Sequence, residues 1–365
     1  MTTTTQQDVP VQPRTQWGFV FLLVLIALGA GIWYSGVFEP KPRIAIVTAS
    51  QGPFWDLLAR GATEAAASSD VTVEIIRSSG DAAEQTKLIQ SLIGKGYQGV
   101  GVSANDPANQ AAVLSELGAQ TNLIMFDSDC PISQRLCFIG SDNYDAGRSC
   151  GEFVAKACPE GGEVVICVGS LEKENGQRRR QGVVDFLMDR PASSARQMDP
   201  VDAPLKGPKY TIVATLVDNL DPQRAQAMAA EALEKHPNVK CFVGLFASNT
   251  PSILRALEQK QKSGKVHVVG FDFNDETLAG IENGQVYASM MQDAYNIGAE
   301  TVKILADVSR GNKLRLPMFQ VQRISCDAVT KENLPEVRAK LASKSNAPAP
   351  SPASAAPATQ SASAQ

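Results

Sequence analysis

Short apolar runs typical of buried strands alternate with segments of helical periodicity along most of this chain of 365 residues. We expect strands over residues 43–48, 71–77, 99–103, 122–127, 137–142, 163–169, 210–216, 241–246, 266–271 and 287–292. We expect helices that begin near Pro53 and after Asp81, or that cover 107–119, 144–157, 176–189, 222–235, 251–260, 275–282 and finally 294–309. This regular alternation indicates parallel sheets covered by helices on both faces. Two open sheets of about five strands each explain it better than one large sheet.

Polar and aromatic side chains gather directly after several of these strands. Phe54 and Trp55 follow the first strand, residues 127–129 follow the fourth, Asp272 follows the ninth and Gln292 ends the tenth. In open α/β sheets, ligands bind at the carboxyl ends of the strands. Aromatic rings stack on the apolar faces of sugar rings, whereas carboxylates and amides form hydrogen bonds with hydroxyl groups. The pattern is typical of a site for a neutral, polyhydroxylated ligand.

Several of these polar residues also fit structural roles. Asp142, Thr250 and Asp275 are expected to be N-caps of the helices that follow them. Phe54 taken alone is typical of a core residue. Of the three consecutive arginines at 178–180, we expect only one to turn inward. Neither a phosphate-binding G-x-G-x-x-G loop nor a G-x-S-x-G nucleophile turn follows any strand.

Charge and histidine content exclude several classes of function. The formal net charge of -4 removes a general electrostatic reason to bind nucleic acid. Only two histidines, His236 and His267, are present, so a histidine-rich metal site or a histidine-based triad is hard to assemble. We expect no metal and no cofactor.

The chain has seven cysteines and no C-x-x-C pair, which argues against a zinc or thioredoxin motif. Cys130 and Cys137 flank a turn that contains proline, and a disulfide between them is one possibility. The alternative is that the cysteines are small buried apolar residues, which suits Cys167 and Cys241 within their strands.

The two ends of the chain differ from its middle. Residues 17–38 carry no charge and would form a helix of roughly 33 Å, enough to cross a bilayer core of about 30 Å. We expect an uncleaved membrane anchor, and a cleaved signal peptide is the alternative. Residues 1–16 and the Ala-, Pro- and Ser-rich tail over 343–365 bury too little apolar surface to order themselves.

From about Arg43 to Cys326 the chain resembles the ribose-binding family of periplasmic proteins, whose effector-binding relatives include the lac-repressor family. The motifs that carry the resemblance are GPFW at 52–55, FIGSDNYDAGRSC at 138–150, NGQRRRQGVVDF at 175–186 and VVGFDFNDE at 268–276. The resemblance implies a type I periplasmic binding protein, with two Rossmann-like lobes joined by three crossing segments and closed by a hinge motion. The expected lobes are 43–141 with 293–320, and 142–292 with 321–330.

The resemblance also implies the residues that contact the ligand. They are Phe54, Trp55, Ser103, Asp127, Ser128, Gln177, Arg179, Asn249, Phe271, Asp272 and Gln292. Two positions depart from the ribose-type pattern. Ser128 stands where the family has arginine, and Gln177 aligns with the first arginine of its R-x-R segment, which leaves Arg179 at the second, more structural one. These departures favour another monosaccharide, a polyol or a ligand with a positive group.

The predicted function is capture of a small polar solute in the periplasm by a monomer that delivers it to the permease of an ABC importer. The alternative is a membrane-anchored sensor that presents the ligand to a sensor kinase or chemoreceptor. A transcriptional regulator would need an N-terminal DNA-binding domain, and the apolar segment stands in that place. Asp127 and Asp272 resemble the paired carboxylates of a glycosidase only in type, so we expect no enzyme.

Overall fold

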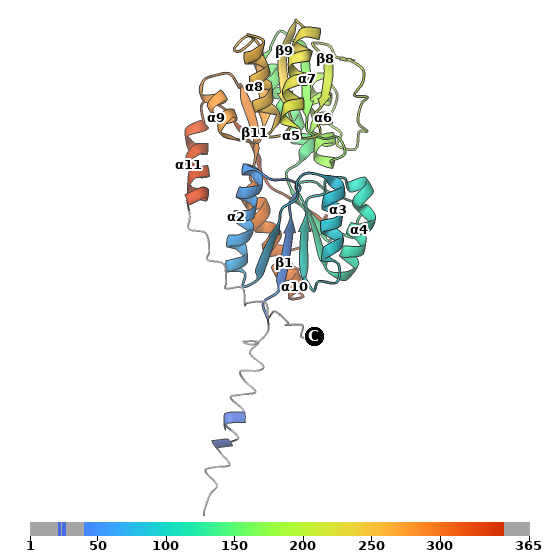
Figure 1. The fold of residues 1–365 in the computed structure, drawn as a ribbon, viewed down its shortest axis with the longest axis vertical. Helices are drawn as coiled ribbons and strands as arrows, with labels where there is room; N and C mark the ends of the chain where they lie inside the picture. Colours follow the sequence, from blue (N-terminus) through green and yellow to red (C-terminus); the bar gives the residue numbers. More distant parts are fainter. Residues whose placement is uncertain (1–20, 23, 27–39, 347–365) are drawn as a thin grey trace, which may run out of the picture. The chain divides into compact units, whose positions relative to one another are not determined.

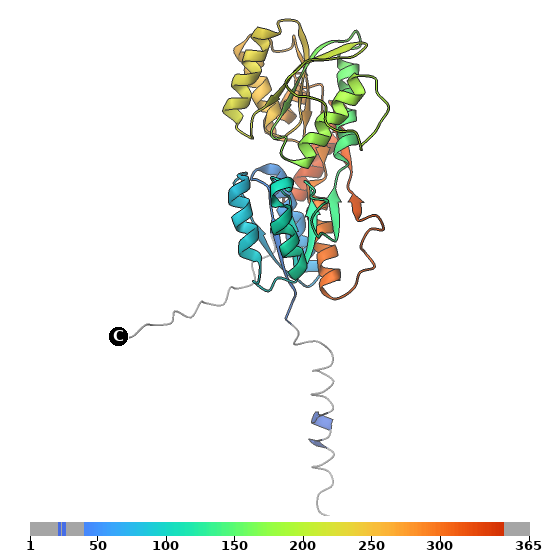
Figure 2. The same cartoon turned by 90° about the vertical axis from the view of Figure 1, so that its right-hand side faces the viewer.

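A computed structural model of the chain describes residues 21, 22, 24–26 and 40–346. The chain divides into two units, residues 1–41 and residues 42–365, and the fold described below is that of the second unit. Figures 1 and 2 show that this unit contains two α/β lobes, one around β1, α2, α3, α4 and α10 and the other around α5 to α9.

The first lobe is built on a six-stranded sheet in the order β12-β5-β4-β3-β1-β2, and all its strand pairs are parallel. Its strands are β1 (Arg43–Val47), β2 (Thr72–Ile76), β3 (Gly99–Val102), β4 (Asn122–Phe126), β5 (Cys137–Gly140) and β12 (Val321–Arg323). Its helices are α2 (Pro53–Ser68), α3 (Ala82–Leu92), α4 (Pro107–Gln120) and α10 (Ala294–Ser309). One apolar cluster buries α2 and α10 against one face of the sheet, and another buries α3 and α4 against the opposite face.

The second lobe is built on a seven-stranded sheet in the order β13-β11-β10-β9-β6-β8-β7. Only its edge strands β13 and β7 run antiparallel to their neighbours. The strands are β6 (Gly162–Val168), β7 (Leu205–Lys206), β8 (Tyr210–Val217), β9 (Val239–Gly244), β10 (His267–Phe271), β11 (Ala288–Gln292) and β13 (Cys326–Val329). The helices are α5 (Asn143–Ala157), α6 (Glu174–Leu187), α7 (Pro222–Lys235), α8 (Asn249–Gln259), α9 (Asp275–Glu282) and α11 (Leu334–Asn346).

Three segments cross between the sheets, after β5, after β11 and after β12. The crossings are joined by backbone hydrogen bonds, because Ile324 N–H donates to Gly140 O at 2.9 Å and Asp293 N–H donates to Ser325 O at 3.3 Å. The third crossing therefore lies between β12 and β13. The expectation that 321–330 belong to the second lobe is wrong for 321–323, because β12 pairs with β5 in the first sheet.

The ten expected strands are all present, and their ends agree with the prediction to about two residues. The sheets are larger than expected because β7, β12 and β13 are edge strands of only 2, 3 and 4 residues, too short for a period-two pattern. The prediction that 294–309 is the last helix is wrong, since α11 follows it. The same helix overturns the disordered tail at 343–346, and the rest of that tail lies outside the described residues.

The predicted membrane segment is mostly outside the part of the chain that the structure describes. Within that segment, residues 21, 22 and 24–26 are helical. Among the described residues, no helix combines the length and the apolar character needed to cross a membrane. The expectation for residues 1–16 also concerns residues that are not described.

The expected helix caps are correct at one of three positions. Asp142 caps α5 by accepting hydrogen bonds from the backbone N–H groups of the first turn. Thr250 and Asp275 lie within the first turns of their helices, and the N-caps are Ser248 and Asn274. Asn274 accepts a hydrogen bond through its side chain, whereas Ser248 does not.

All seven cysteines are free thiols, so the disulfide considered between Cys130 and Cys137 is not formed. The two side chains belong to the apolar clusters on opposite faces of the first sheet. The sheet therefore separates them, which the short spacing in the sequence does not reveal. Cys167 and Cys241 are buried within β6 and β9, as predicted for small apolar residues.

Glycines allow α5 and α6 to pack with their backbones in close contact. A Cβ atom on Gly147 would lie 2.1 Å from Arg179 O, and one on Gly182 would lie 2.1 Å from Tyr144 O. Any larger residue at either position must push the two helices apart. This contact fixes the position of α6, which carries Arg179.

We predict that Gly182→Ala lowers the free energy of unfolding by about 3 kcal/mol, at the upper end of the usual overpacking cost, because backbone atoms cannot move aside as a flexible side chain can. Urea unfolding followed by circular dichroism measures the change. Glu152→Ala, at an exposed position of α5, is the control and should change stability by less than about 0.5 kcal/mol. Equal stabilities of Gly182→Ala and the wild type would contradict this account of the helix contact.

Candidate functional site

Two aspartates occupy equivalent positions in the two lobes. Asp127 follows β4 and Asp272 follows β10, each the third strand from its edge of the sheet. Both residues adopt the left-handed backbone conformation, with φ of 57° and 56°. Non-glycine residues take this conformation at a cost, and such residues cluster at functional sites. The equivalent turns place both carboxylates at the carboxyl ends of the strands, where the lobes face each other.

The carboxylate of Asp127 joins the two lobes. Ser103 Oγ donates to Asp127 Oδ2 at 2.8 Å from within the first lobe. From the second lobe, Asn175 Nδ2 donates to the same oxygen at 3.3 Å, and Arg179 Nη2 lies 3.9 Å from Oδ1. The two lobes are therefore closed on each other at this carboxylate.

Arg179 is 2% exposed and lies at the centre of the site. Its Nε donates to Asn143 Oδ1 at 2.9 Å and its Nη1 donates to Leu245 O at 3.1 Å. Its guanidinium carbon lies 3.9 Å from the centroid of the Phe271 ring, a cation–π contact. The planar guanidinium is thus fixed by hydrogen bonds at its edge and by an aromatic ring at its face.

Gln177 does not reach this cluster, although it was expected to contact the ligand. Its Nε2 donates to Leu171 O at 2.6 Å, and the side chain borders a separate cavity. Residues 175 and 179 are one turn apart on α6 and share a face, whereas residue 177 points to the other side. Arg179, and not Gln177, therefore faces Asp127, although the resemblance gave Arg179 the more structural position.

A second arginine of the run also turns inward, contrary to expectation. Arg180 is 1% exposed and points away from the cleft. It donates to the carbonyl oxygens of Asp199 and Pro200 at 2.8 Å and to Thr215 Oγ1 at 3.0 Å. Arg180 therefore holds the loop before β7, while Arg179 serves the site.

Asp272 is a buried carboxylate whose lost hydration is only partly replaced by hydrogen bonds and opposite charge. Gln292 Nε2 donates to its two oxygens at 3.1 and 3.3 Å, and Gln292 N–H donates to Oδ1 at 3.2 Å. Burial raises the pKa of Asp272 to about 6, and the Arg179 guanidinium and the hydrogen bonds from Gln292 only partly oppose this rise. The negative charge of Asp127 adds to the rise. A hydroxyl donor in the cleft would complete the solvation of this carboxylate.

Four polar atoms at this site are buried without a hydrogen bond partner among the described residues. They are Ser128 Oγ, Asn175 Oδ1, Arg179 Nη2 and Gln292 Oε1. Buried polar atoms in proteins are normally paired, and leaving one unpaired costs about 1–3 kcal/mol. The set includes a cationic donor, two amide acceptors and a hydroxyl group. A ligand whose groups both donate and accept, as hydroxyl groups do, matches that set.

The aromatic residues expected at the site take different positions. Phe271 contacts the Arg179 guanidinium directly. Phe54 and Trp55 contact each other edge to face, with ring centroids 4.9 Å apart, and both belong to the apolar cluster under α2 and α10. They remain 6% and 8% exposed.

Asn249 is engaged within its own lobe. Its Nδ2 donates to Asp218 Oδ2 at 2.6 Å, and its Oδ1 accepts from Phe246 N–H at 2.9 Å. The Phe246 ring in turn lies 5.4 Å from the Arg179 guanidinium. Asn249 therefore supports a wall of the site. Burial raises the pKa of its partner Asp218 to about 6, against the hydrogen bonds that this carboxylate accepts.

Sequence reasoning missed three members of the cluster. Asn175 stands one turn before Arg179, and the i, i+4 spacing within the quoted motif was a usable signal. Asn143 lies next to an expected helix cap, and nothing in the sequence marks its contact with Arg179. Lys173 is 4% exposed, and burial lowers its pKa to about 8 while the Asp127 carboxylate opposes that shift. Lys173 thus adds a cationic group near Asp127.

The sequence model of the family described as "Periplasmic binding protein domain" matches residues 44–313, well over half of the chain. The chain belongs to this family. This chain is therefore an extracytoplasmic solute-binding protein, and its two-lobed architecture is the type I fold.

Characterised relatives match nearly their full length. The D-allose-binding periplasmic protein of Escherichia coli is 25% identical over 291 residues, which cover 77% of this chain and 88% of the relative. The ribose import binding protein of Salmonella typhimurium is 25% identical over 302 residues, which cover 80% and 93%.

Solved structures agree with the fold. An ABC transporter solute-binding protein from Burkholderia graminis, in complex with D-arabinose, has a TM-score of 0.73 and 25% identity, and covers 81% of this chain and 98% of that one. A glucose-galactose binding protein from Geobacillus stearothermophilus has a TM-score of 0.72 and 24% identity, and covers 81% and 100%.

We predict that Asp272→Asn stabilises the ligand-free protein at pH 8 but not at pH 4. The folded-state pKa of about 6 lies above the ordinary value of 3.8, so stability is lost as the pH rises through this window. The amide removes this loss, and the gain at pH 8 is at most about 3 kcal/mol. Urea unfolding at the two pH values measures it, with the exposed Asp202→Asn as control. An equal effect at both pH values would refute the role assigned to burial of Asp272.

Proposed function

We propose that this periplasmic binding protein captures a monosaccharide or polyol between its lobes. The observation that carries the proposal is the group of buried polar atoms around Arg179 and Asp127 that have no hydrogen-bond partner among the described residues, which matches hydroxyl groups that donate and accept. Relatives named for allose and ribose, and a structural neighbour in complex with D-arabinose, support the same class of ligand.

Each polar residue would have a separate role toward the sugar. Asp127 and Asp272 would accept hydrogen bonds from hydroxyl groups of the sugar. Arg179 would donate through Nη2 to a hydroxyl oxygen, and Gln292 would accept through Oε1 from a hydroxyl group. Ser103 orients Asp127 through its hydrogen bond. The rings that face the apolar side of the sugar are Phe54, Trp55 and Phe271, and Ser128 leaves room where the ribose-type pattern has arginine.

We further propose that the lobes are 43–141 with 293–323, and 142–292 with 326–346. In this proposal the protein acts as a monomer, is held at the membrane through residues 17–38 and delivers the sugar to the permease of an ABC importer. The alternative is presentation of the bound sugar to a sensor kinase or chemoreceptor. Binding, not turnover, is its activity, so incubation with glycosides should release no product.

Thermal-shift screening of the purified full-length protein against a carbohydrate library tests the proposal. A sugar or polyol that binds the folded state should raise the melting temperature when its concentration exceeds its dissociation constant. The reason is that binding to the folded state shifts the folding equilibrium toward that state. A shift produced by amines or other solutes, and by no sugar, would contradict the sugar assignment.

Substitutions that remove the charge test the residues. We predict that Asp127→Asn and Arg179→Gln each weaken sugar binding by about 10- to 100-fold, the cost of a charge-assisted hydrogen bond. Gln177→Ala is the matched control on the same helix and should leave affinity within about 2-fold, because its side chain borders another cavity. Isothermal titration with the sugar found by the screen measures all three. A larger loss in Gln177→Ala than in Arg179→Gln would place the site elsewhere.

A further inference from the structure

Helix α11 lies beyond residues 44–313, the segment that the family model matches. Figure 1 shows it alongside α9 at one side of the lobes. Its sequence, LPEVRAKLASKSN, mixes apolar and basic residues without a broad apolar stripe. Such a helix depends on tertiary contacts for its stability, so its contacts indicate what it does.

The first half of α11 is attached to the second lobe. Leu334 is 4% exposed and belongs to the apolar cluster between this lobe's sheet and α7, α8 and α9. Val337 packs against the same cluster. Arg338 Nη2 forms an ion pair with Glu282 Oε2 of α9 at 2.7 Å. These contacts fix the helix to α9.

The second half of α11 reaches the first lobe. Lys340 Nζ lies 3.2 Å from Asp293 Oδ2, and Lys344 Nζ lies 2.8 Å from Asp293 Oδ1. The Lys344 ammonium also lies 4.6 Å from the centroid of the Tyr295 ring of α10. Leu341 packs against apolar clusters of both lobes. One short helix therefore contacts both lobes at once.

The position of Asp293, to which these two lysines bind, affects both β11 and α10. It directly follows Gln292 of the candidate site, lies in a crossing segment and caps α10 by accepting from Asn296 N–H at 3.2 Å. Its side chain is 8% exposed, so its two ion pairs are partly shielded from solvent. Displacing Asp293 would displace the start of α10 and the end of β11 together.

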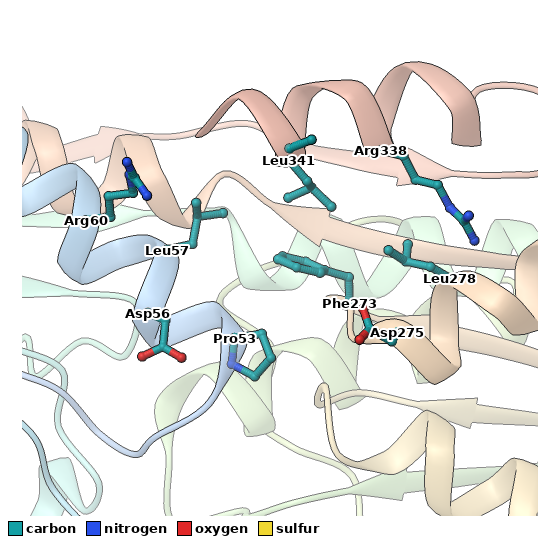
Figure 3. A pocket seen from close by; sticks show the side chains of 10 residues that line it. Pro53, Asp56, Leu57, Arg60, Phe273, Asp275, Leu278, Arg338 and Leu341 are labelled. Atoms are coloured by element: carbon teal, nitrogen blue, oxygen red, sulfur yellow. The ribbon is translucent and has the colours of Figure 1, made fainter. Parts of the chain in front are cut away.

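A cavity lies between the two lobes next to α11. A cavity of about 660 Å³ is bordered by α2, by the segment from Phe273 to α9, and by α11. Figure 3 shows Leu57, Phe273 and Leu341 around it. Two of its charged residues already have partners, since Asp56 pairs with Arg77 and Arg338 pairs with Glu282. At this place between the lobes, α11 therefore borders the cavity and also contacts both lobes.

We propose that Lys340 and Lys344 are positioning residues that hold Asp293 and so favour the closed arrangement of the lobes that binds solute. The contacts of α11 with both lobes exist together only when Asp293 and Tyr295 lie next to α9. Rotation about the crossing segments would break one set. Since apparent affinity scales with the fraction of protein in the competent arrangement, these two lysines raise affinity without touching the ligand. The affinity part rests on the proposed function.

Hydrogen exchange of the full-length protein without any sugar tests the positioning role. In Lys340→Ala/Lys344→Ala, peptides that contain Ser103, Asp127 and Asn175 should exchange about 3- to 10-fold faster than in the wild type, because two partly buried ion pairs are lost. Lys340→Arg/Lys344→Arg should restore slow exchange. The matched control is Lys235→Ala/Lys260→Ala, which removes two lysine–glutamate pairs within the second lobe.

Unchanged exchange at the three cleft peptides, or an equal increase in the control, would overturn the proposal. So would faster exchange confined to α11 itself, which would indicate a purely local role. Titration with D-ribose and D-allose adds a second readout, in which the alanine variant should bind about 3- to 10-fold more weakly. If neither sugar binds the wild type, the exchange result still tests α11, so the two proposals fail separately.

Discussion

The buried guanidinium of Arg179 organises the centre of this protein. It lies on the face of Phe271, is held at its edge by Asn143 and by the carbonyl of Leu245, and approaches Asp127 across the two lobes. A buried cation of this kind is stable only where hydrogen bonds and opposite charge replace its hydration. That requirement accounts for the polar cluster in which the two lobes meet at Arg179.

The same cluster shows a conflict between stability and binding. Asp272 is buried with a raised pKa, and both site aspartates adopt left-handed backbone conformations. Several neighbouring polar atoms have no hydrogen-bond partner within the described part of the chain. Each of these features costs folding free energy, and natural proteins retain such costs where function needs them. A hydroxylated ligand would repay the cost through hydrogen bonds, which links ligand capture to lobe closure.

In our proposal, the hinge consists of the three crossing segments together with the contacts that α11 makes with them. The backbones of the crossing segments are hydrogen-bonded to one another near Gly140 and Ser325. Asp293 also forms ion pairs with two lysines of α11. The apolar clusters of the lobes meet through Phe273 and Leu341, beside a cavity of about 660 Å³. In our proposal, the energy difference between open and closed arrangements depends on a few contacts, several of which lie outside the candidate site.

Local pattern alone determined the ten principal strands, the helices between them and the carboxyl-end location of Asp127, Asp272 and Gln292, since strand and helix periodicity and the parallel-sheet rule act over short stretches. The tertiary structure decided what depends on distant segments. It paired the short strands β7, β12 and β13, stabilised α11 by contacts with both lobes, and separated Cys130 from Cys137 by a sheet. It also turned Arg179, and not Gln177, toward Asp127, because the rotation of α6 is set by its contact with α5, and no local pattern encodes that rotation.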